Sequence, residues 1–350
     1  MLTFLIMAGG SGERFWPLST KEKPKQLLKI FSDKSLIRLA YERILPLVDK
    51  NRIFIATNEI QVVALKEDLK EVHDSRIIIE PAFRDTAAAI GYGSTVISKY
   101  YDNPTICVLA SDHLIKDDVE FRKVIQIAEK EAQNNQIVTL GIKPSYPETG
   151  YGYIEVSNSI INVPTKSLGF KEKPNYDIAK KYYESRKFLW NSGMFIFKYD
   201  VILNSFHKYS KNHYDVINTL KTMFDVNEGL KTANLVKNEF MNFEKKSIDF
   251  AVMEHADNIM VIPSEFGWND VGNYLAFDEL FNKDENNNVI RNIKCISVDS
   301  NNNIIVSNSN SNQNVSLLGV RNMIIAITKN NILICEKNKN QDIKKIIKLL

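Results

Sequence analysis

Residues 5–26 read Leu-Ile-Met-Ala-Gly-Gly-Ser-Gly-Glu-Arg-Phe-Trp-Pro-Leu-Ser-Thr-Lys-Glu-Lys-Pro-Lys-Gln. An apolar strand enters a glycine-rich turn, and basic residues follow it. Such a turn lets backbone N–H groups approach an anion, and Arg14, Lys23 and Lys25 can supply positive charge around it. We therefore expect the triphosphate of a nucleotide to be bound by the turn itself, at Ala8, Gly9, Gly10, Ser11 and Gly12.

Two commoner glycine motifs do not fit this stretch. The dinucleotide-binding fingerprint needs a third glycine where Phe15 stands. The P-loop needs a lysine and a hydroxyl residue directly after its last glycine, where Glu13 and Arg14 stand. A glycine turn without any ligand is the remaining alternative, and the arginine together with the downstream Pro-Lys-Gln disfavours it.

The composition is that of a soluble globular protein, with 44% hydrophobic and 25% charged residues in a chain of 350. This length suggests one large or two moderate domains. A net charge of +3 is too weak to predict nucleic acid as a partner. No apolar run approaches the ~20 residues of a membrane helix and no basic leader is visible, so we expect a cytoplasmic protein without a membrane partner.

The three cysteines, Cys107, Cys295 and Cys335, lie far apart in apolar runs. Their spacing matches no metal-binding motif. We expect them to be buried structural thiols in a reducing compartment.

Short apolar runs alternate with helical patterns through the first half of the chain. The expected strands are Phe4–Ala8, Arg52–Ala56, Arg76–Glu80, Ile106–Ala110 and Ile137–Gly141, and the expected helices are Ser35–Leu47, Gln61–Val72, Ala87–Tyr100 and Phe121–Asn134. This alternation predicts an α/β fold with a Rossmann-like, mostly parallel sheet and helices on both faces. Ligands gather at the carboxyl ends of such strands, which is where the glycine turn stands.

The composition changes after about residue 282. Before that point, further helices are expected at Tyr176–Ser185 and Val201–Tyr209. The later segments are rich in Asn and Ser. They contain short, evenly spaced β-rich runs at Cys295–Val298, Asn303–Val306, Met323–Thr328 and Ile332–Glu336. This pattern predicts a small β domain over residues 283–350, a left-handed β-helix-like coil or a roll, closed by an amphipathic helix at Gln341–Leu350.

The segment Ala8–Ser19 with Pro24-Lys25-Gln26 resembles the signature of sugar-1-phosphate nucleotidyltransferases, and Phe15–Ser19 is similar to the mannose-1-phosphate guanylyltransferase branch. The resemblance extends over nearly the whole chain, with its motifs in order. It implies a GT-A-like nucleotidyltransferase domain over residues 1–282, a β domain that contributes to self-association, and a homodimer. Many bacterial relatives continue into an isomerase domain, whereas this sequence ends at Leu350, so isomerase activity is not expected.

Two carboxylates are candidate metal ligands. Asp112 follows the apolar run Ile106–Ala110 and Ser111, and a carboxylate at a strand end can hold Mg²⁺ on phosphate oxygens. Asp270 lies in Phe266–Gly272, a stretch that also contains two glycines and a tryptophan. A helix cap for Asp112 and a surface turn for Asp270 are the alternatives. The resemblance implies that both aspartates hold Mg²⁺, with Ser111 beside the nucleotide.

Three motifs are candidates for the sugar phosphate. Pro147–Ile154 contains Gly150, which allows close approach of a ligand, and Tyr151, whose aromatic ring suits a pyranose. A hairpin turn with exposed aromatics is equally compatible with this stretch of sequence. Adjacent residues of a strand point to opposite faces, so Glu172 and Lys173 can share a ligand only where the strand ends or twists. Otherwise they form a solvated charge cluster. The resemblance implies that Glu172 and Asn191 bind sugar hydroxyls and that Lys173 binds the sugar phosphate.

The segment Glu80–Ala89 resembles the guanylyltransferase stretch that covers the nucleotide base, which implies contacts from Pro81, Arg84, Asp85 and Thr86. Asp85 and Thr86 are also good helix caps, and capping is the alternative role for them. This chain has Asp85 where many relatives have asparagine. A carboxylate can accept hydrogen bonds from guanine N1–H and the exocyclic amine, so the residue is compatible with guanine.

The resemblance implies transfer of GMP from GTP to α-D-mannose 1-phosphate, with Mg²⁺ as cofactor. Arg14 would steady the leaving diphosphate, Lys25 would neutralise the phosphates, and Lys173 would orient the nucleophile. Two alternatives stay open at this point. One is a different pair of substrates, such as glucose or manno-heptose phosphate or another triphosphate. The other is a non-catalytic nucleotide-sugar sensor.

Overall fold

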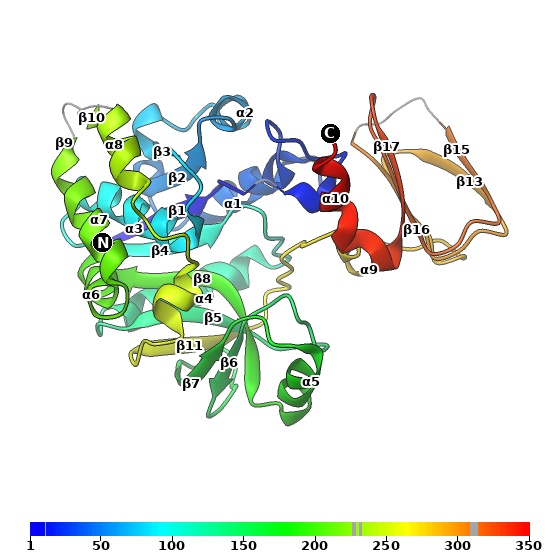
Figure 1. Cartoon of the computed structure of the whole chain (residues 1–350). Helices are drawn as coiled ribbons and strands as arrows, with labels where there is room; N and C mark the ends of the chain where they lie inside the picture. Colours follow the sequence, from blue (N-terminus) through cyan, green and yellow to red (C-terminus); the bar gives the residue numbers. More distant parts are fainter. Residues whose placement is uncertain (11, 226–228, 231–232, 309–313) are drawn as a thin grey trace.

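The computed structural model describes residues 1–10, 12–225, 229–230, 233–308 and 314–350 (Figure 1). Within these ranges the chain forms a nine-stranded sheet covered by helices, followed by a set of short β coils that lie to one side of it. The helices that connect the first five strands are those that the sequence predicted, and the architecture is an α/β sheet domain followed by a β-helix-like domain.

The large sheet has the strand order β3-β2-β1-β4-β8-β5-β11-β7-β6. Strand β8 is antiparallel to β4, β5 and β6, and β7 is antiparallel to β6 and β11, whereas the other pairs are parallel. The bounds are β1 (Leu2–Met7), β2 (Ile53–Asn58), β3 (Ile77–Glu80), β4 (Thr105–Ala110), β5 (Ile137–Ile142), β6 (Tyr153–Val156), β7 (Thr165–Lys171), β8 (Phe188–Lys198) and β11 (Ile259–Ser264). The five strands expected in the first half are confirmed to within two residues at each end.

Helices cover both faces of this sheet (Figure 1). Alternation along β1 explains why, because Leu5 enters one apolar core while Phe4 and Ile6 enter the other. Against the Leu5 face pack α3 (Asp85–Ser98), α6 (Tyr199–Tyr209), α7 (Lys211–Met223) and α8 (Ala233–Phe240). Against the opposite face pack α1 (Leu36–Ile44), α2 (Val62–Asp68) and α4 (Asp118–Ala132), and α5 (Tyr176–Ser185) packs near β6 and β8.

The coils after residue 288 stack in parallel register. Val289 of β12 (Val289–Arg291) pairs with Ile304 of β14 (Ile304–Ser307), and Ile304 pairs with Ile324 of β16 (Met323–Ile327). A second ladder joins β13 (Lys294–Val298) to β15 (Asn314–Leu318), and β17 (Ile332–Glu336) closes the stack by pairing antiparallel with β16. A further two-stranded pair is β9 (Phe224–Asp225) with β10 (Gly229–Leu230). The short β runs predicted here are therefore the walls of a β-helix-like stack.

The asparagines of this region form its corners. Asn287, Asn302 and Asn322 occupy equivalent positions in successive coils, and their φ angles are 59°, 54° and 58°. This left-handed region is costly for most side chains and tolerated by asparagine. The composition that predicted polar turns thus reflects a repeated backbone requirement.

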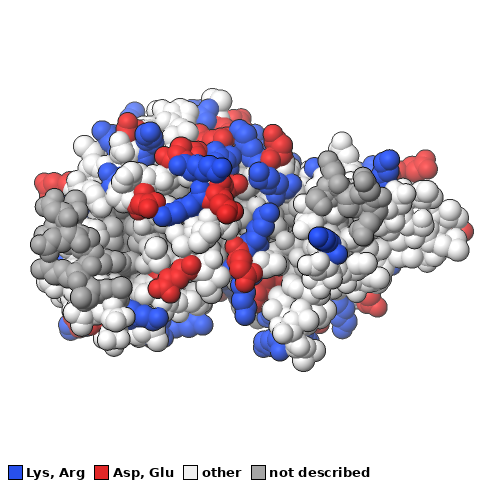
Figure 2. Space-filling view, turned by 90° about the horizontal axis from the view of Figure 1, so that it is seen from above, with Lys and Arg blue, Asp and Glu red and all other residues white. Residues whose placement is uncertain are grey.

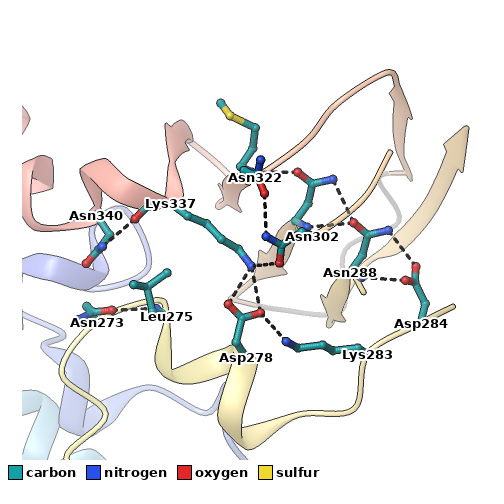
Figure 3. A network of polar contacts seen from close by, with 12 residues as sticks. Asn273, Leu275, Asp278, Lys283, Asp284, Asn288, Asn302, Asn322, Lys337 and Asn340 are labelled. Carbon is teal, nitrogen blue, oxygen red and sulfur yellow. Dashed lines mark hydrogen bonds and ion pairs between the residues drawn. The ribbon is translucent and has the colours of Figure 1, made fainter. Parts of the chain in front are cut away.

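The next position carries a buried amide side chain in the first two of these coils, at Asn288 and Asn303, and Met323 in the third. The Asn288 Oδ1 atom accepts from the Asn303 backbone N–H at 3.0 Å, and Asn303 Oδ1 accepts from the Met323 N–H at 2.9 Å. Asn288 and Asn303 are 1% and 0% exposed. Figure 3 shows Asn288 within the wider polar network, close to Asn302 and Asn322. This ladder of two amide side chains satisfies backbone groups where one coil passes into the next.

One apolar cluster joins the coils to the sheet domain. It contains Phe15 from the N-terminal segment, Tyr274 from the loop before α9 (Ala276–Leu280), Ile304 from β14, and Ile343 from α10 (Ile343–Ile347). The Tyr274 hydroxyl donates to the Phe15 carbonyl at 2.9 Å. The terminal helix is shorter than predicted, because residues Lys337–Asp342 form a 3₁₀ segment before α10 begins.

All three cysteines lie in strands and none forms a disulfide, but the prediction that all are buried is wrong. Cys107 is buried, and burial raises the pKa of its thiol well above the ordinary value. Cys295 and Cys335 are half-buried because the two-layer coils are too thin to enclose them. Within the described ranges, no helix is long and apolar enough to cross a membrane.

We predict that Asn303→Ala lowers the free energy of unfolding by about 1–3 kcal/mol, because it leaves the buried Met323 N–H and Asn288 amide without their partner. Chemical denaturation followed by tryptophan fluorescence and circular dichroism measures this change. The exposed Asn301→Ala should stay within about 0.5 kcal/mol of wild type. Equal stabilities for both variants would contradict a structural role for the ladder.

Candidate active site

The glycine turn after β1 is held through its carbonyl groups. Gln26 Nε2 donates to the Ala8 and Gly10 carbonyls at 2.9 and 3.3 Å, and Gln61 Nε2 donates to Gly10 at 3.1 Å. Both glutamines are buried, at 3% and 4% exposure. No motif marks Gln61 in the sequence, since it lies directly before α2 and far along the chain from the turn.

The three glycine N–H groups of the same turn are unpaired among the described residues. Gly9, Gly10 and Gly12 donate to no acceptor within the part of the chain that the structure describes, which omits Ser11. A turn whose carbonyls are fixed and whose amides are free presents donors to an anion. The predicted role of Ser11 concerns a residue outside the described ranges, and it stays a prediction.

Gly12 and Gly10 lack side chains for different reasons. Gly12 has a φ of +61°, and a Cβ on it would lie 2.6 Å from the Lys25 Cβ and 2.7 Å from the Lys25 nitrogen. A Cβ on Gly10 would meet nothing within 4 Å. The fold therefore requires glycine at position 12, whereas position 10 borders open space.

Lys25 connects three separate parts of the site. Its Nζ contacts Asp112 Oδ2 at 2.7 Å, the Asp270 carbonyl at 2.7 Å and the Val271 carbonyl at 2.9 Å. The residue is only 4% exposed. A buried ammonium needs such partners, and here they come from the ends of β4 and of the loop after β11. The structure thus brings together Lys25, Asp112 and Asp270 as predicted.

Asp112 follows β4, whose last residue pairs with Met7 at the end of β1. The intervening Ser111 is buried, and its N–H donates to the Met7 carbonyl at 3.2 Å. Burial raises the pKa of Asp112, but Lys25 and His113 outweigh it, so the net pKa lies below the ordinary value. Asp112 is therefore a carboxylate near neutral pH, which suits a phosphate-bound cation.

Asp270 sits in a tightly fixed loop. Its Oδ1 accepts from the Tyr151 hydroxyl at 2.6 Å and from the Gly272 N–H at 3.0 Å. The next residue, Val271, is buried and has a φ of 49°, which is a strained conformation for a β-branched side chain. Burial and the charge of Asp270 raise the pKa of Tyr151 well above its ordinary value, so its hydroxyl stays protonated and donates. Tyr151 is therefore not the exposed hairpin aromatic that the sequence allowed.

Two cavities meet at these groups. The smaller has a volume of about 410 Å³ and is lined by Gly12, Glu13, Arg14, Phe15, Lys25, Asp112, Asp270, Gly272 and Lys344. The larger, about 710 Å³, has Arg14, Asp270 and Gly272 in common with it and adds Gly150, Tyr151 and Lys173 among its walls. Both volumes are in the range of small-molecule sites. Of the predicted residues, Gly12, Arg14 and Lys25 thus border one space and Gly150, Tyr151 and Lys173 the adjoining one, whereas Ala8, Gly9, Gly10, Glu172 and Asn191 line neither.

Glu172 and Lys173 lie just beyond the end of β7, where Lys173 takes a φ of 45°. Their side chains pair at 2.7 Å, although Glu172 is 7% exposed and Lys173 62% exposed. The strand has ended, so both side chains can serve one ligand. The buried Glu172 also excludes a fully solvated charge cluster.

Both the oxygen and the nitrogen of the Asn191 side-chain amide, on β8, form hydrogen bonds. Its Oδ1 accepts from the Thr139 hydroxyl and the Gly193 N–H, and its Nδ2 donates to Asp249 Oδ1 at 3.1 Å. Burial, with the nearby Glu172, raises the pKa of Asp249 to about 7. The sequence did not single out Asp249, because it lies in the helical turn Asp249–Met253 with no motif around it.

The predicted base-binding residues link β3 to the segment before β11. Arg84 Nη2 donates to the Met241 carbonyl at 2.7 Å, and the Thr86 hydroxyl accepts from the Ile248 N–H at 2.9 Å. Asp85 begins α3 with a φ of 68°, and its Oδ1 accepts from the Thr86 N–H at 2.7 Å. Pro81 lies half-buried just after β3. None of these residues lines the two cavities above, so their contact with a base stays a prediction.

Glu80 is a candidate that the sequence analysis missed. It ends β3, is 8% exposed, and its carboxylate has no hydrogen-bond partner among the residues described. Burial raises its pKa to about 7. A Cβ on Gly9 would lie 3.4 Å from Glu80 Oε1, so the carboxylate stands beside the glycine turn. A carboxylate at a strand end was the same signal that identified Asp112.

Charges of both signs are interspersed over the middle of the face shown in Figure 2. This agrees with the small net charge of +3. The positive groups of the site act locally, through the contacts above.

Residues 3–287 match a family model described as nucleotidyl transferase. The chain belongs to the nucleotidyl transferase family. Residues 294–350 match a second model, the MannoseP isomerase/GMP-like beta-helix domain. The two matches agree with the sheet domain and the stacked coils. The expected fold class is confirmed, but the sheet is mixed and not mostly parallel, because β7 and β8 run antiparallel to their neighbours.

Similar proteins match nearly the whole of this chain. The chain is 37% identical to the mannose-1-phosphate guanylyltransferase RfbM of Salmonella typhimurium, over 99% of this chain and 72% of that protein. It is 32% identical to a mannose-1-phosphate guanylyltransferase of Klebsiella pneumoniae, over 100% of this chain and 74% of that protein. A solved Thermus thermophilus structure, described as a mannose-1-phosphate geranyltransferase, superposes with a TM-score of 0.88 at 29% identity, over 99% of this chain and 98% of that one.

We predict opposite defects for two alanine variants of this nucleotidyl transferase. Gly12→Ala should lower the thermal stability, because its Cβ collides with the Lys25 backbone at a left-handed position. Gly10→Ala should leave the melting temperature unchanged, because its Cβ enters open space. It should nevertheless weaken triphosphate binding by roughly tenfold or more, because the added methyl group occupies space that the ligand would use.

Differential scanning calorimetry and isothermal titration with a nucleoside triphosphate separate the two effects. A Gly10→Ala protein that binds the nucleotide as tightly as wild type would show that the ligand does not approach this turn.

Proposed function

We propose that this nucleotidyl transferase converts GTP and α-D-mannose 1-phosphate to GDP-mannose and diphosphate. The names of the Salmonella and Klebsiella relatives support the reaction. The observation that carries the proposal is the position of Lys25, which is bonded to Asp112 and to the backbone of Asp270 beside a glycine turn with free amides.

The chemistry needs alignment and charge neutralisation more than proton transfer. The sugar phosphate is anionic near neutral pH, so one of its oxygens can attack the α-phosphorus without a general base. A bond forms from that oxygen to the α-phosphorus, and the bond to the bridging oxygen of the diphosphate breaks, with the electron pair leaving on the diphosphate. Effective catalysis then comes from holding both phosphates in line and stabilising their charge.

The smaller cavity is suited to the triphosphate. The free amides of the glycine turn donate to phosphate oxygens, and Arg14 lies on the border between the two cavities. Its Nη1 has one long contact, 3.4 Å, to the Gly272 carbonyl, so the guanidinium is free to bind the leaving diphosphate. Lys25 neutralises charge at the reacting phosphates from its fixed position.

The two aspartates fit a magnesium ion. Asp112 Oδ1 and Asp270 Oδ2 have no hydrogen-bond partner in the described part of the chain, and both residues line the smaller cavity. Mg²⁺ prefers oxygen ligands and commonly takes one or two carboxylates together with phosphates and water. When bound, Mg²⁺ would neutralise charge on the phosphates of both substrates.

The larger cavity is suited to mannose 1-phosphate. Lys173 lines the cavity and carries a mostly exposed ammonium that can hold the sugar phosphate. The missing side chain of Gly152 lets Glu172 lie against the backbone, since a Cβ there would lie 2.5 Å from Glu172 Oε2. Glu172 and the amide of Asn191 then offer acceptors and a donor to sugar hydroxyls.

We further propose that Glu80 selects guanine. Guanine presents two adjacent donors, N1–H and the exocyclic amine, and a carboxylate presents two adjacent acceptors. Asp85 already accepts from the Thr86 N–H, whereas Glu80 is without a partner among the described residues and stands beside Gly9. A guanine bound there would supply the donors that this buried carboxylate lacks.

The homodimer and the cytoplasmic location stay predictions from the sequence. The sensor alternative would require loss of a metal carboxylate or a phosphate-binding cation, and Arg14, Lys25, Asp112, Lys173 and Asp270 are all present.

The proposal predicts diphosphate release from GTP and mannose 1-phosphate with Mg²⁺, measured against a matrix of triphosphates and sugar 1-phosphates. Asp112→Asn should lower kcat/KM by roughly 10²-fold or more, because it removes charge from the proposed metal site. The exposed Asp102→Asn serves as its control and should keep wild-type activity.

Diphosphate release with a different pair of substrates would replace GTP and mannose 1-phosphate as the proposed substrates, while the protein would still be a nucleotidyl transferase. Nucleotide binding without release from any pair would favour the sensor. Normal turnover by Asp112→Asn would refute the metal assignment.

Glu80→Gln should raise KM for GTP about 10- to 100-fold, because it replaces a charged acceptor by an amide that cannot accept both donors. The KM for mannose 1-phosphate should stay constant. The exposed Glu59→Gln, at the same edge of the sheet, is the matched control. An unchanged KM for GTP would remove Glu80 from base recognition.

The same variant has a predicted pH signature. The pKa of Glu80 is raised from 4.5 to about 7, so its contribution to stability is present below pH 4.5 and is lost as the pH rises through 7. The stability of Glu80→Gln relative to wild type should therefore increase between pH 4.5 and 8, by up to about 3 kcal/mol. Asp249 titrates in both proteins, so its contribution to stability cancels when the two are compared. Parallel stability curves would contradict the raised pKa.

A further inference from the structure

The α10 helix packs against the segment that carries the glycine turn. Ile343, its first residue, is 1% exposed and belongs to the same apolar cluster as Phe15 and Leu18. Figure 1 shows α10 in red beside the dark blue N-terminal segment, between the sheet and the coils. The helix is therefore part of the wall behind the candidate active site.

This packing brings Lys344 to the smaller cavity, where it joins Arg14, Lys25 and Asp112 as a lining residue. The three cations differ in what they already bind. Lys25 is fully engaged by Asp112 and two carbonyls, and Arg14 has one long contact. Lys344 has no hydrogen bond or ion pair within the described ranges. Among the three cations it is therefore the one whose charged group has no partner in the described part of the chain.

The start of the segment that carries Lys344 is fastened in place. Lys337 Nζ contacts Asp278 Oδ2 at 2.8 Å and Asn302 Oδ1 at 2.9 Å, and Asn340 Nδ2 donates to the Lys337 carbonyl at 2.7 Å (Figure 3). Asp278 belongs to α9, shortly after the Asp270 loop. The connection thus ties the segment that carries Lys344 to α9, the helix that follows the Asp270 loop.

We propose that Lys344 binds the β- and γ-phosphates of the nucleoside triphosphate, and hence the leaving diphosphate. The assignment rests on the proposed function, which gives the smaller cavity to the triphosphate. Negative charge accumulates on the diphosphate as its bond to the α-phosphorus breaks, and an uncommitted ammonium beside it stabilises that charge. The last helix of the β-helix domain thereby contributes a residue to catalysis in the sheet domain.

Lys345 provides a matched control in the same helix. It is paired with Asp342 at 2.8 Å, its side chain is 71% exposed, and it lines neither cavity. Lys344→Ala and Lys345→Ala remove the same group from neighbouring positions, so they change the net charge equally. Any general electrostatic effect should appear in both variants.

The test measures the dissociation constant of inorganic diphosphate by calorimetry and the KM values for GTP and mannose 1-phosphate. Lys344→Ala should weaken diphosphate binding and raise KM for GTP about tenfold each, with the KM for mannose 1-phosphate unchanged. Lys344→Glu should have a larger effect than Lys344→Ala, and Lys344→Arg a smaller one. Lys345→Ala should match wild type, and all variants should keep the wild-type melting temperature.

The two proposals fail in different ways. If the protein shows no guanylyltransferase activity but Lys344→Ala still weakens diphosphate binding, the proposed function falls and this inference stands. If Lys344→Ala binds diphosphate and GTP as wild type does, the inference is overturned. It is also overturned if Lys345→Ala has an equal effect, or if the wild-type protein does not bind diphosphate.

Discussion

The candidate site depends on one buried ammonium. Lys25 is nearly excluded from solvent, and its contacts with Asp112 and with the Asp270 and Val271 carbonyls offset the cost of burying the charge. Those contacts fix the distance between the end of β4 and the loop after β11. The absence of a side chain at Gly12 allows the Lys25 backbone to approach closely enough to make them. The strain at Val271 is a local cost of aiming its carbonyl at the same atom.

The stacked coils support this arrangement as well as following it in sequence. Phe15 and Tyr274, which flank the glycine turn and the Asp270 loop, share one apolar cluster with residues of the coils. The asparagine corners keep those coils in register, so the surface against which the loops pack is itself rigid. A segment whose composition resembles a disordered tail is therefore part of the framework of the site.

Much of this could be predicted from the sequence, and the reasons are local. The strand of Ile106–Ala110 and the aspartate after it are adjacent in the chain, so Asp112 could be placed at a strand end without knowing the fold. Glu80 is also a carboxylate at the end of a strand, but the resemblance of the following residues assigned base binding to Pro81 and Arg84 instead. Gln61, Asp249 and Lys344 reach the site only through tertiary packing of helical elements, and no nearby motif marks them. The half-buried Cys295 and Cys335 were misjudged because an apolar β run in a thin stack exposes one of its faces.

The packing of Phe15 against the cluster that contains Ile343 has a consequence for biosynthesis. The two residues are 328 positions apart, from 15 to 343, so the glycine turn lacks its apolar backing until nearly the whole of the described chain has been synthesised. The sheet can form early around β1 to β4, which pair with one another, whereas the turn acquires its final support late. A nascent chain on the ribosome would thus already resemble the folded protein in its core while its anion-binding turn is still incompletely packed.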